Sequence, residues 1–194
     1  MDNQDIRTLK ILEEIDNDHT PSQRDLSRKL NISLGLVNSF IKRLAQKGYF
    51  KVTNIPANRV KYILTPEGAA EKTRLTYEYI QYSFEFYKRS RKELRRLFQD
   101  LMSKNIQSII FYGATDLAEI AYVSLQETPI KLKTIVDKLK IGDKFLGGII
   151  IEDPSEIKLL PSDWILITAM DSKNEVLESL LEKGISRNKV VVLE

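Results

Sequence analysis

Residues 22–52 read SQRDLSRKLNISLGLVNSFIKRLAQKGYFKV, and this stretch decides the fold of the first third of the chain. Apolar residues recur at helical spacing on both sides of Asn31-Ile32-Ser33, which predicts a helix, a three-residue turn and a longer second helix. Gly48 is the expected stop of the second helix. The crossing of the two helices is expected to be fixed by Leu26, Leu30, Ile32, Val37 and Ile41.

The flanking residues complete a small α+β domain. Upstream, apolar residues spaced three apart between Ile6 and Ile15 predict a first helix. Thr20 and Pro21 are expected to be the N-cap and first residue of the next helix. Downstream, residues 49–52 and 60–64 are typical of two strands joined by a polar, turn-rich loop. We therefore expect a three-helix domain closed by a hairpin over residues 1–64.

The outer face of the longer helix, which follows Ser33, suits the major groove of DNA, which is about 12 Å wide. Asn and Ser can hydrogen-bond base edges, Lys and Arg suit phosphates or guanine, and small residues permit close approach. The residues expected to contact DNA are Ser33, Leu34, Gly35, Asn38, Ser39, Lys42 and Arg43, with Asn58, Arg59 and Lys61 in the hairpin. No acidic residue interrupts the sequence from Ile32 to Thr65. A domain of this shape can also bind protein, and that alternative stays open.

This region resembles the winged helix-turn-helix transcription regulators of the MarR-like class. In that class L-x-x-L-x-x-K-G closes the recognition helix, and the matching positions here are Ile41, Leu44, Lys47 and Gly48. Residues 62–72, YILTPEGAAEK, resemble the second strand of the wing running into the next helix. The resemblance covers residues 5–72 and is nearest to regulators associated with exopolysaccharide gene clusters. It implies a transcription regulator whose partner is double-stranded DNA.

The amino-acid composition excludes several classes of site and of protein. The chain has 194 residues, no Cys and one His (His19), so thiolate zinc sites, disulfides and multi-histidine metal sites are excluded. No apolar run reaches the roughly 18 residues of a membrane span, and we expect a cytoplasmic protein. Residues 1–105 carry 20 Lys and Arg against 13 Asp and Glu, whereas residues 106–194 carry 10 against 14. A basic half joined to an acidic half indicates that only the first half meets polyanions.

Residues 65–105 are typical of one long linker helix, with Thr65 as N-cap and Pro66 at its first position. An apolar stripe with alternating spacings of three and four follows one face: Leu75, Tyr79, Tyr82, Phe86, Leu94, Leu97 and Leu101. We interpret the stripe as the seam of a homodimer, because a small domain cannot bury so long a face. The stripe packing within the chain is the alternative. The opposite face carries Lys88, Arg89, Arg91, Lys92, Arg95 and Arg96 and is interpreted as a solvated surface.

Residues 106–194 alternate short apolar runs with helical stretches. The strands expected from these runs are 109–112, 130–136, 148–151, 164–168 and 190–193. Helices are expected from Asp116 to Leu125, Pro154 to Ile157 and Lys173 to Lys183. This alternation predicts a three-layer α/β domain around a five-stranded parallel sheet, which is a short Rossmann-like domain.

The turn after the first of these strands, Gly113-Ala114-Thr115-Asp116, lies where a dinucleotide-binding domain has its glycine-rich loop. Only the first glycine is present, and Asp137 ends the second strand, where it suits a ribose hydroxyl. The segment resembles the Rossmann-like domain at the front of nucleotide-sugar epimerase and dehydratase relatives. Gly113, Ala114, Thr115, Asp116 and Asp137 are therefore the candidate ligand site. The ligand implied is a nucleotide or nucleotide-sugar, with no cofactor certain.

Catalysis is not expected. No tyrosine has a lysine four residues later, as short-chain dehydrogenases require, and no histidine lies in the second half. The resulting interpretation is a homodimeric, DNA-binding regulator whose Rossmann-like domain senses a small-molecule effector or serves assembly. The competing class is an adaptor or enzyme of nucleotide-sugar metabolism whose winged domain binds protein.

Overall fold

The computed structural model of the chain describes residues 1–17, 20–55, 59–157 and 163–193. The chain divides into two compact units, Met1–Glu85 and Phe86–Glu194. One helix, α4 (Pro66–Ser103), contributes its first part to the N-terminal unit and its last part to the C-terminal unit. Each unit is described by itself below.

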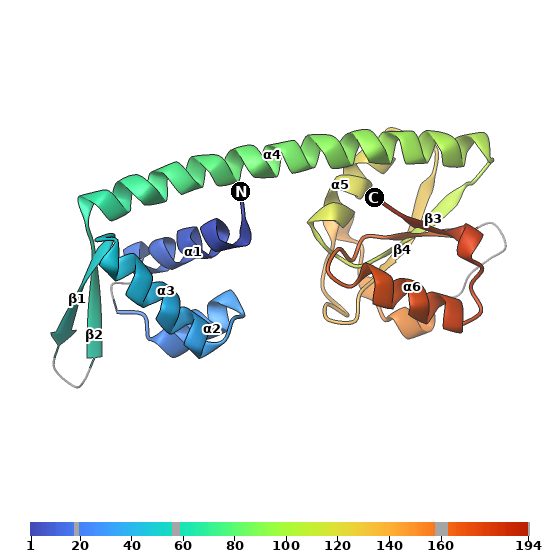
Figure 1. Ribbon diagram of the computed structural model, residues 1–194. Helices are drawn as coiled ribbons and strands as arrows, with labels where there is room; N and C mark the ends of the chain where they lie inside the picture. Colours follow the sequence, from blue (N-terminus) through green and yellow to red (C-terminus); the bar gives the residue numbers. More distant parts are fainter. Residues whose placement is uncertain (18–19, 56–58, 158–162, 194) are drawn as a thin grey trace. The chain divides into compact units, whose positions relative to one another are not determined.

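The N-terminal unit has three helices, a two-stranded sheet and the start of α4 (Figure 1). The helices are α1 (Asn3–Asn17), α2 (Gln23–Leu30) and α3 (Leu34–Gln46). Strands β1 (Phe50–Ile55) and β2 (Arg59–Leu64) pair antiparallel, from Phe50 opposite Leu64 to Ile55 opposite Arg59. The expected order of three helices and a hairpin is confirmed.

The core of this unit joins all of its elements. The residues that meet there are Leu9, Ile11, Leu12, Ile15, Leu26, Val37, Phe40, Ile41, Leu44, Phe50, Tyr62 and Leu75. Leu30 and Ile32 lie at the edge of this core, where they are only partly buried. The rings of Phe50 and Tyr62, one from each strand of the hairpin, pack edge to face with centroids 5.5 Å apart, and both are buried in this core.

Hydroxyl side chains begin three helices. Ser22 caps α2, and its oxygen accepts a hydrogen bond from the backbone N–H of Asp25 at 3.1 Å. The expectation that Thr20 and Pro21 begin this helix is therefore wrong by two residues, because Ser22 has an acidic residue at the reciprocal capping position. Ser33 caps α3, and Thr65 caps α4 by accepting from the N–H of Gly68.

Gly68 lies in the first turn of α4, where glycine is a poor helix former, and the packing explains its presence. A Cβ built there would lie 1.8 Å from the backbone oxygen of Tyr49. Only glycine lets the start of α4 approach the beginning of the hairpin this closely.

The C-terminal unit is built on a five-stranded, all-parallel sheet in the order β5-β4-β3-β6-β7. The strands are β3 (Ser108–Tyr112), β4 (Lys131–Val136), β5 (Ile151–Glu152), β6 (Asp163–Ile167) and β7 (Val190–Val192). Helices α5 (Asp116–Leu125) and α6 (Lys173–Glu182) and the short 3-10 turns η1 (Leu146–Gly148), η2 (Pro154–Glu156) and η3 (Arg187–Lys189) connect them. The predicted five-stranded parallel sheet with connecting helices is confirmed. The third strand, expected at 148–151, is shorter and later, at Ile151–Glu152.

Helices cover both faces of this sheet. Ile109 and Phe111 of β3 point into a core formed with α5 and the last part of α4. Ile110, between them in sequence, points into the opposite core with Val176 and Leu180 of α6. A central parallel strand buries both of its faces, which explains why β3 is a continuous apolar run rather than an alternating one.

The apolar stripe of α4 divides between two cores. Leu75 is fully buried in the N-terminal unit, and Leu94 and Leu101 are fully buried in the C-terminal unit. Phe98, which the expected stripe omits, is also fully buried there. The interpretation of the whole stripe as a dimer seam is therefore wrong at both ends of the stripe. There the side chains are buried in the cores of their own chain. Among the described residues, no helix is both long and apolar enough to cross a membrane.

Candidate nucleic-acid interface and C-terminal cleft

Helix α3 presents a continuous exposed face. Its buried side consists of Val37, Phe40, Ile41 and Leu44, so helical geometry turns the intervening positions toward solvent. The residues exposed on that side are Ser33, Leu34, Gly35, Asn38, Ser39 and Lys42, six of the seven expected at this helix. Leu34 is 40% exposed, which is unusual for leucine and suits contact with a thymine methyl group.

Arg43 is the expected contact that points elsewhere. Its guanidinium lies 4.5 Å over the Phe40 ring, and Nη1 donates a hydrogen bond to Oε1 of Gln4 at 3.0 Å. Arg43 Nε is buried without a hydrogen-bond partner among the described residues. These contacts tie α3 to α1, so Arg43 supports the helix from behind.

The hairpin adds two lysines on one face. Lys61 pairs with Thr53 across the strands, and Lys51 pairs with Ile63, two positions along. Residues two apart on a strand share a face, so Lys51 and Lys61 lie on the side opposite the buried Phe50 and Tyr62. Lys51 was not among the expected contacts, although its alternation with Phe50 was a usable signal. Asn58 lies outside the described residues, and Arg59 is described only as the first residue of β2.

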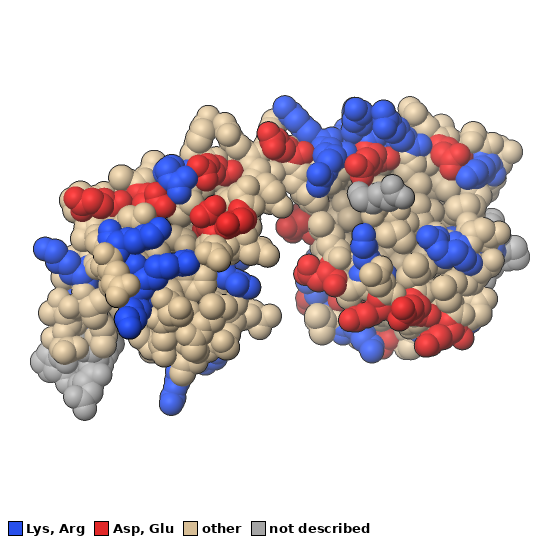
Figure 2. All heavy atoms as spheres, in the orientation of Figure 1, with Lys and Arg blue, Asp and Glu red and all other residues tan. Residues whose placement is uncertain are grey.

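Positive and negative side chains are unevenly distributed in the N-terminal unit. The segment from Ile32 to Thr65, which holds α3 and the hairpin, contains six Lys or Arg and no Asp or Glu. In Figure 2 the acidic side chains of the N-terminal unit gather toward its upper edge, and Lys and Arg lie below them. A surface of this kind attracts a polyanion with no repulsion from its own side chains.

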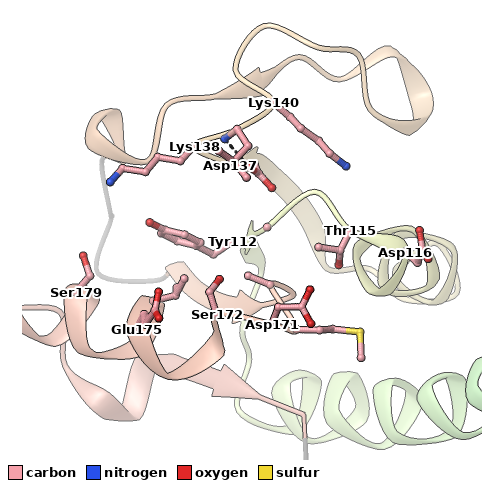
Figure 3. Close-up of a pocket in the computed structure, with 15 residues that line it drawn as sticks. Tyr112, Thr115, Asp116, Asp137, Lys138, Lys140, Asp171, Ser172, Glu175 and Ser179 are labelled. Carbon is pink, nitrogen blue, oxygen red and sulfur yellow. Dashed lines mark hydrogen bonds between the residues drawn. The ribbon is translucent and has the colours of Figure 1, made fainter. Parts of the chain in front are cut away.

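The C-terminal unit has a cleft of about 750 Å³ at the carboxyl ends of β3, β4 and β6. The chain leaves β3 for β4 on one side and later returns to β6 on the other, so this is the switch point of the sheet, where α/β domains bind ligands. Figure 3 shows Tyr112 in the middle, with Asp137 on one side and Asp171, Ser172 and Glu175 on the other. Burial, helped by Asp137 and Asp153, raises the pKa of Tyr112.

Four of the five candidate ligand residues, Gly113, Thr115, Asp116 and Asp137, line this cleft, and Ala114 is buried beside them. The side chains of Thr115 and Asp137 already have partners within the chain. Oδ2 of Asp137 accepts from the N–H of Ala114 at 2.8 Å, and Oδ1 accepts from the N–H of Leu139 at 2.8 Å. Oγ1 of Thr115 donates to the carbonyl of Thr168 at 2.6 Å. Gly113 has φ +110°, and a Cβ there would lie 2.5 Å from the backbone nitrogen of Ala169.

These contacts do not fit a pyrophosphate in the manner of a dinucleotide-binding loop. Such a loop offers free backbone N–H groups, whereas the N–H of Ala114 is bonded to a carboxylate. Asp116 adds negative charge in the first turn of α5. Across the cleft, Asp116, Asp137, Asp171 and Glu175 outnumber Lys138 and Lys140. Gly113 is required by the approach of the chain's own backbone, without any ligand.

Two family models match the chain, one in each unit. Residues 4–51 match the family model described as winged helix-turn-helix DNA-binding. That match includes the capped α2, the turn and all of α3, so the N-terminal unit is a winged helix-turn-helix with the hairpin as its wing. Residues 105–191 match the model described as C2185-like, N-terminal, which covers β3 to β6 and the first two residues of β7.

Several solved structures resemble part of the chain. YusO from Bacillus subtilis is 16% identical with a TM-score of 0.35, and the match covers 40% of this chain and 58% of YusO. The PcaV transcriptional regulator from Streptomyces coelicolor is 18% identical with a TM-score of 0.42, covering 50% of this chain and 74% of PcaV. MepR from S. aureus in complex with DNA is 16% identical with a TM-score of 0.39, covering 54% and 78%. No curated protein matches the chain. Similarity this low leaves function to the residues themselves.

Proposed function

We propose that the chain is a DNA-binding transcription regulator whose winged helix-turn-helix reads double-stranded DNA. The observation that carries the proposal is the exposed, acid-free surface formed by α3 and the wing between Ile32 and Thr65. Phosphate contacts supply most of the affinity of such a domain, and side chains on the recognition helix supply sequence preference.

Each exposed residue has a role that its chemistry suits. Asn38 and Ser39 lie in the middle of α3, where a recognition helix meets base edges. Gly35 has open space beyond its Cα and allows close approach to the groove. Lys42 would contact a phosphate or a guanine. Lys51 and Lys61, with Asn58 and Arg59 as expected from the sequence, would contact phosphates or the adjacent minor groove.

The regulator is proposed to act as a homodimer joined through the middle of α4. Tyr77, Ile80 and Phe84 follow one another at spacings of three and four, and they are 64%, 58% and 57% exposed. Tyr79 and Tyr82, two residues of the expected seam, are 41% and 46% exposed and lie on a neighbouring face. Exposed apolar side chains in one row favour an interface between copies. Twofold symmetry would then require a pseudo-palindromic operator.

The C-terminal cleft is proposed to bind a small-molecule effector. Its place at the switch point of the sheet supports a ligand, and the bonded state of Ala114 and Asp137 opposes a pyrophosphate at the start of α5. A nucleotide or nucleotide-sugar would have to bind through its base or sugar. An effector controls DNA binding only if its affinity differs between the conformation that binds DNA and the conformation that does not.

DNA binding is tested by fluorescence anisotropy with duplexes from the protein's own gene neighbourhood and scrambled duplexes of equal length, at several salt concentrations. Asn38→Ala should reduce the preference between the two DNAs, and Lys42→Ala should weaken binding to both. Lys10→Ala on α1 removes an equal charge away from this surface and should change neither. Equal, weak binding of both DNAs by the wild type would favour the alternative, a winged domain that binds protein.

Effector binding is tested by thermal unfolding with a panel of nucleotides and nucleotide-sugars. An upward shift in Tm is expected for at least one ligand, because a ligand that binds only the folded state stabilises it. The absence of a shift with every member of the panel would contradict the sensing role and leave the DNA-binding role unaffected.

A further inference from the structure

The last part of α4 carries a dense group of cations on a unit that is otherwise acidic. From Tyr87 to Arg96, six of ten residues are Lys or Arg and one is Glu. We call these six the α4 basic face: Lys88, Arg89, Arg91, Lys92, Arg95 and Arg96. Residues 106–194, which form most of the rest of the unit, have a net charge of −4. Figure 2 shows Lys and Arg side chains gathered along this part of α4.

Most of these cations line a shared depression. A shallow groove of about 360 Å³ is bordered by Tyr87, Lys88, Arg91, Lys92, Arg95 and Arg96. Lys88, Lys92 and Arg96 are spaced four apart, and so are Arg91 and Arg95, which puts like charges on successive turns of the helix. Like charges at this spacing destabilise an isolated helix by a few tenths of a kcal/mol per pair, about 0.2–0.5. The arrangement therefore opposes helix stability unless an anion lies against it.

The described contacts place one carboxylate from outside the helix against this face. Glu127 accepts from Arg91 and from Arg95, whose Nε lies 2.9 Å from Oε2. Hydrogen bonds from Arg95 and Arg91 hold the pKa of Glu127 below its usual range. Together, Glu127 and Glu93 place two negative charges beside the six positive charges of the α4 basic face. Arg91 Nη1 is moreover buried with no hydrogen-bond partner among the described residues.

We propose that the α4 basic face is a second nucleic-acid contact, which binds phosphates of double-stranded DNA without regard to sequence. Guanidinium groups bind phosphate oxygens through paired, charge-assisted hydrogen bonds, and lysines add point charges. A buried, unpartnered N–H bordering a cationic groove needs an acceptor from outside the chain. The choice of DNA as the polyanion rests on the proposed function, whereas the groove and its unbalanced charge do not.

The test uses the full chain and two DNA duplexes, one that contains the operator and one of scrambled sequence. Both duplexes are long enough to extend well beyond one operator. The double variant Lys92→Ala/Arg96→Ala removes two exposed cations of the face without touching the Glu127 pair. It should weaken binding to both sequences equally and lower the slope of log K against log salt by about 2, one for each phosphate that is no longer neutralised. Lys144→Ala/Lys173→Ala removes the same charge from exposed positions elsewhere in the unit and should leave the slope unchanged.

A third variant works in the opposite direction. Glu127→Gln removes the competing carboxylate, so it should tighten binding to both sequences and raise the salt slope. A purely structural role for the Arg91–Glu127–Arg95 group predicts lower stability with no gain in DNA affinity, which would overturn the inference.

The outcomes separate the inference from the proposed function. Unchanged affinity and slope in Lys92→Ala/Arg96→Ala, with sequence preference intact in the wild type, overturns the second contact and leaves the regulator standing. Loss of binding in that variant, when the wild type shows no preference between operator and scrambled DNA, supports the second contact and overturns the regulator.

Discussion

The carboxylate of Asp137 and the backbone N–H of Ala114 are joined by a 2.8 Å hydrogen bond between the ends of two neighbouring strands. The same carboxylate accepts from the N–H of Leu139, so it organises two loops at once. In a dinucleotide-binding domain the acidic residue at this place holds a ribose and the loop holds a pyrophosphate. Here the Asp137 carboxylate accepts the hydrogen bonds of the loop N–H groups, so neither the carboxylate nor the N–H of Ala114 is left for a ligand.

Asp137→Asn should therefore destabilise the C-terminal unit by about 1–2 kcal/mol, because a neutral amide replaces a charged acceptor of two N–H groups. Urea unfolding of both proteins measures the difference. Asp143→Asn changes an exposed carboxylate of the following loop and is the matched control. The wild type should show no Tm shift with NAD, and a clear shift would mean that the loop opens to accept a dinucleotide.

Gly113→Ala should be among the most damaging substitutions of a small residue in this chain. The new Cβ would meet the backbone of Ala169 at 2.5–2.7 Å, and alanine disfavours φ +110°. A loss of about 3 kcal/mol is expected from overpacking and backbone strain together. Gly184→Ala has a positive φ of +78° but open space around the Cβ, so it isolates the cost of the backbone. Equal losses in the two variants would contradict the steric argument.

Gly35→Ala should separate stability from DNA binding. The position has open space and lies in the first turn of α3, so alanine should stabilise the winged unit by about 0.5 kcal/mol. An added methyl on a face that enters the groove should nevertheless weaken operator binding several-fold. Thermal unfolding and anisotropy on the same sample measure both effects. Gln46→Ala, at the exposed end of the same helix, should leave DNA binding unchanged.

Leu75→Ala and Leu94→Ala should each destabilise a different unit, although both residues lie on one helix. Each side chain is fully buried in its own core, and such truncations cost about 2–5 kcal/mol. Hydrogen exchange should report loss of protection in α1–α3 for the first variant and in β3–β6 for the second. Loss across both units in either variant would show that they unfold together.

Glu127 should titrate below the ordinary glutamate pKa of about 4.3, since hydrogen bonds from Arg95 and Arg91 favour its charged form. A depressed pKa in the folded state contributes stability above the unfolded value, and that contribution is lost as pH falls through the folded value. Carboxyl NMR shifts measure the midpoint. Arg95→Gln should raise it toward 4.3, and Lys144→Ala should not move it. An unchanged midpoint in Arg95→Gln would exclude the pairing in solution.

The fold was largely readable from local patterns in the sequence. The change from helical spacing to short apolar runs after residue 105 gives the second unit its sheet, and α5 begins and ends where the sequence indicates, at Asp116 and Leu125. Side-chain hydroxyls mark the starts of α3 and α4 in the same way. These signals are local, because caps and periodicity depend on residues within one or two turns.

The site was less readable, because its contacts join residues far apart in the sequence. Arg43 looks like a groove contact by spacing, but Gln4 and Phe40 hold its guanidinium against α1. Similarly, Asp137 looks like a ribose ligand until the N–H of Ala114 is found beside it. The apolar row of Tyr77, Ile80 and Phe84 was hidden by the more regular stripe that continues into the leucines. Pairings of this kind depend on tertiary structure, which periodicity does not encode.

The place of Leu75 in the first core has a consequence for biosynthesis. Domains fold in order as the chain emerges from the ribosome, N-terminal first. The winged unit cannot close its core until the opening turns of α4 have been made, since Leu75 belongs to that core. Until then the part of that core which Leu75 completes remains open to chaperones or to other nascent chains. A pause in synthesis before Leu75 has emerged from the ribosome would prolong that exposure, whereas a pause after Glu85 has emerged would give the first unit time to finish before the second begins.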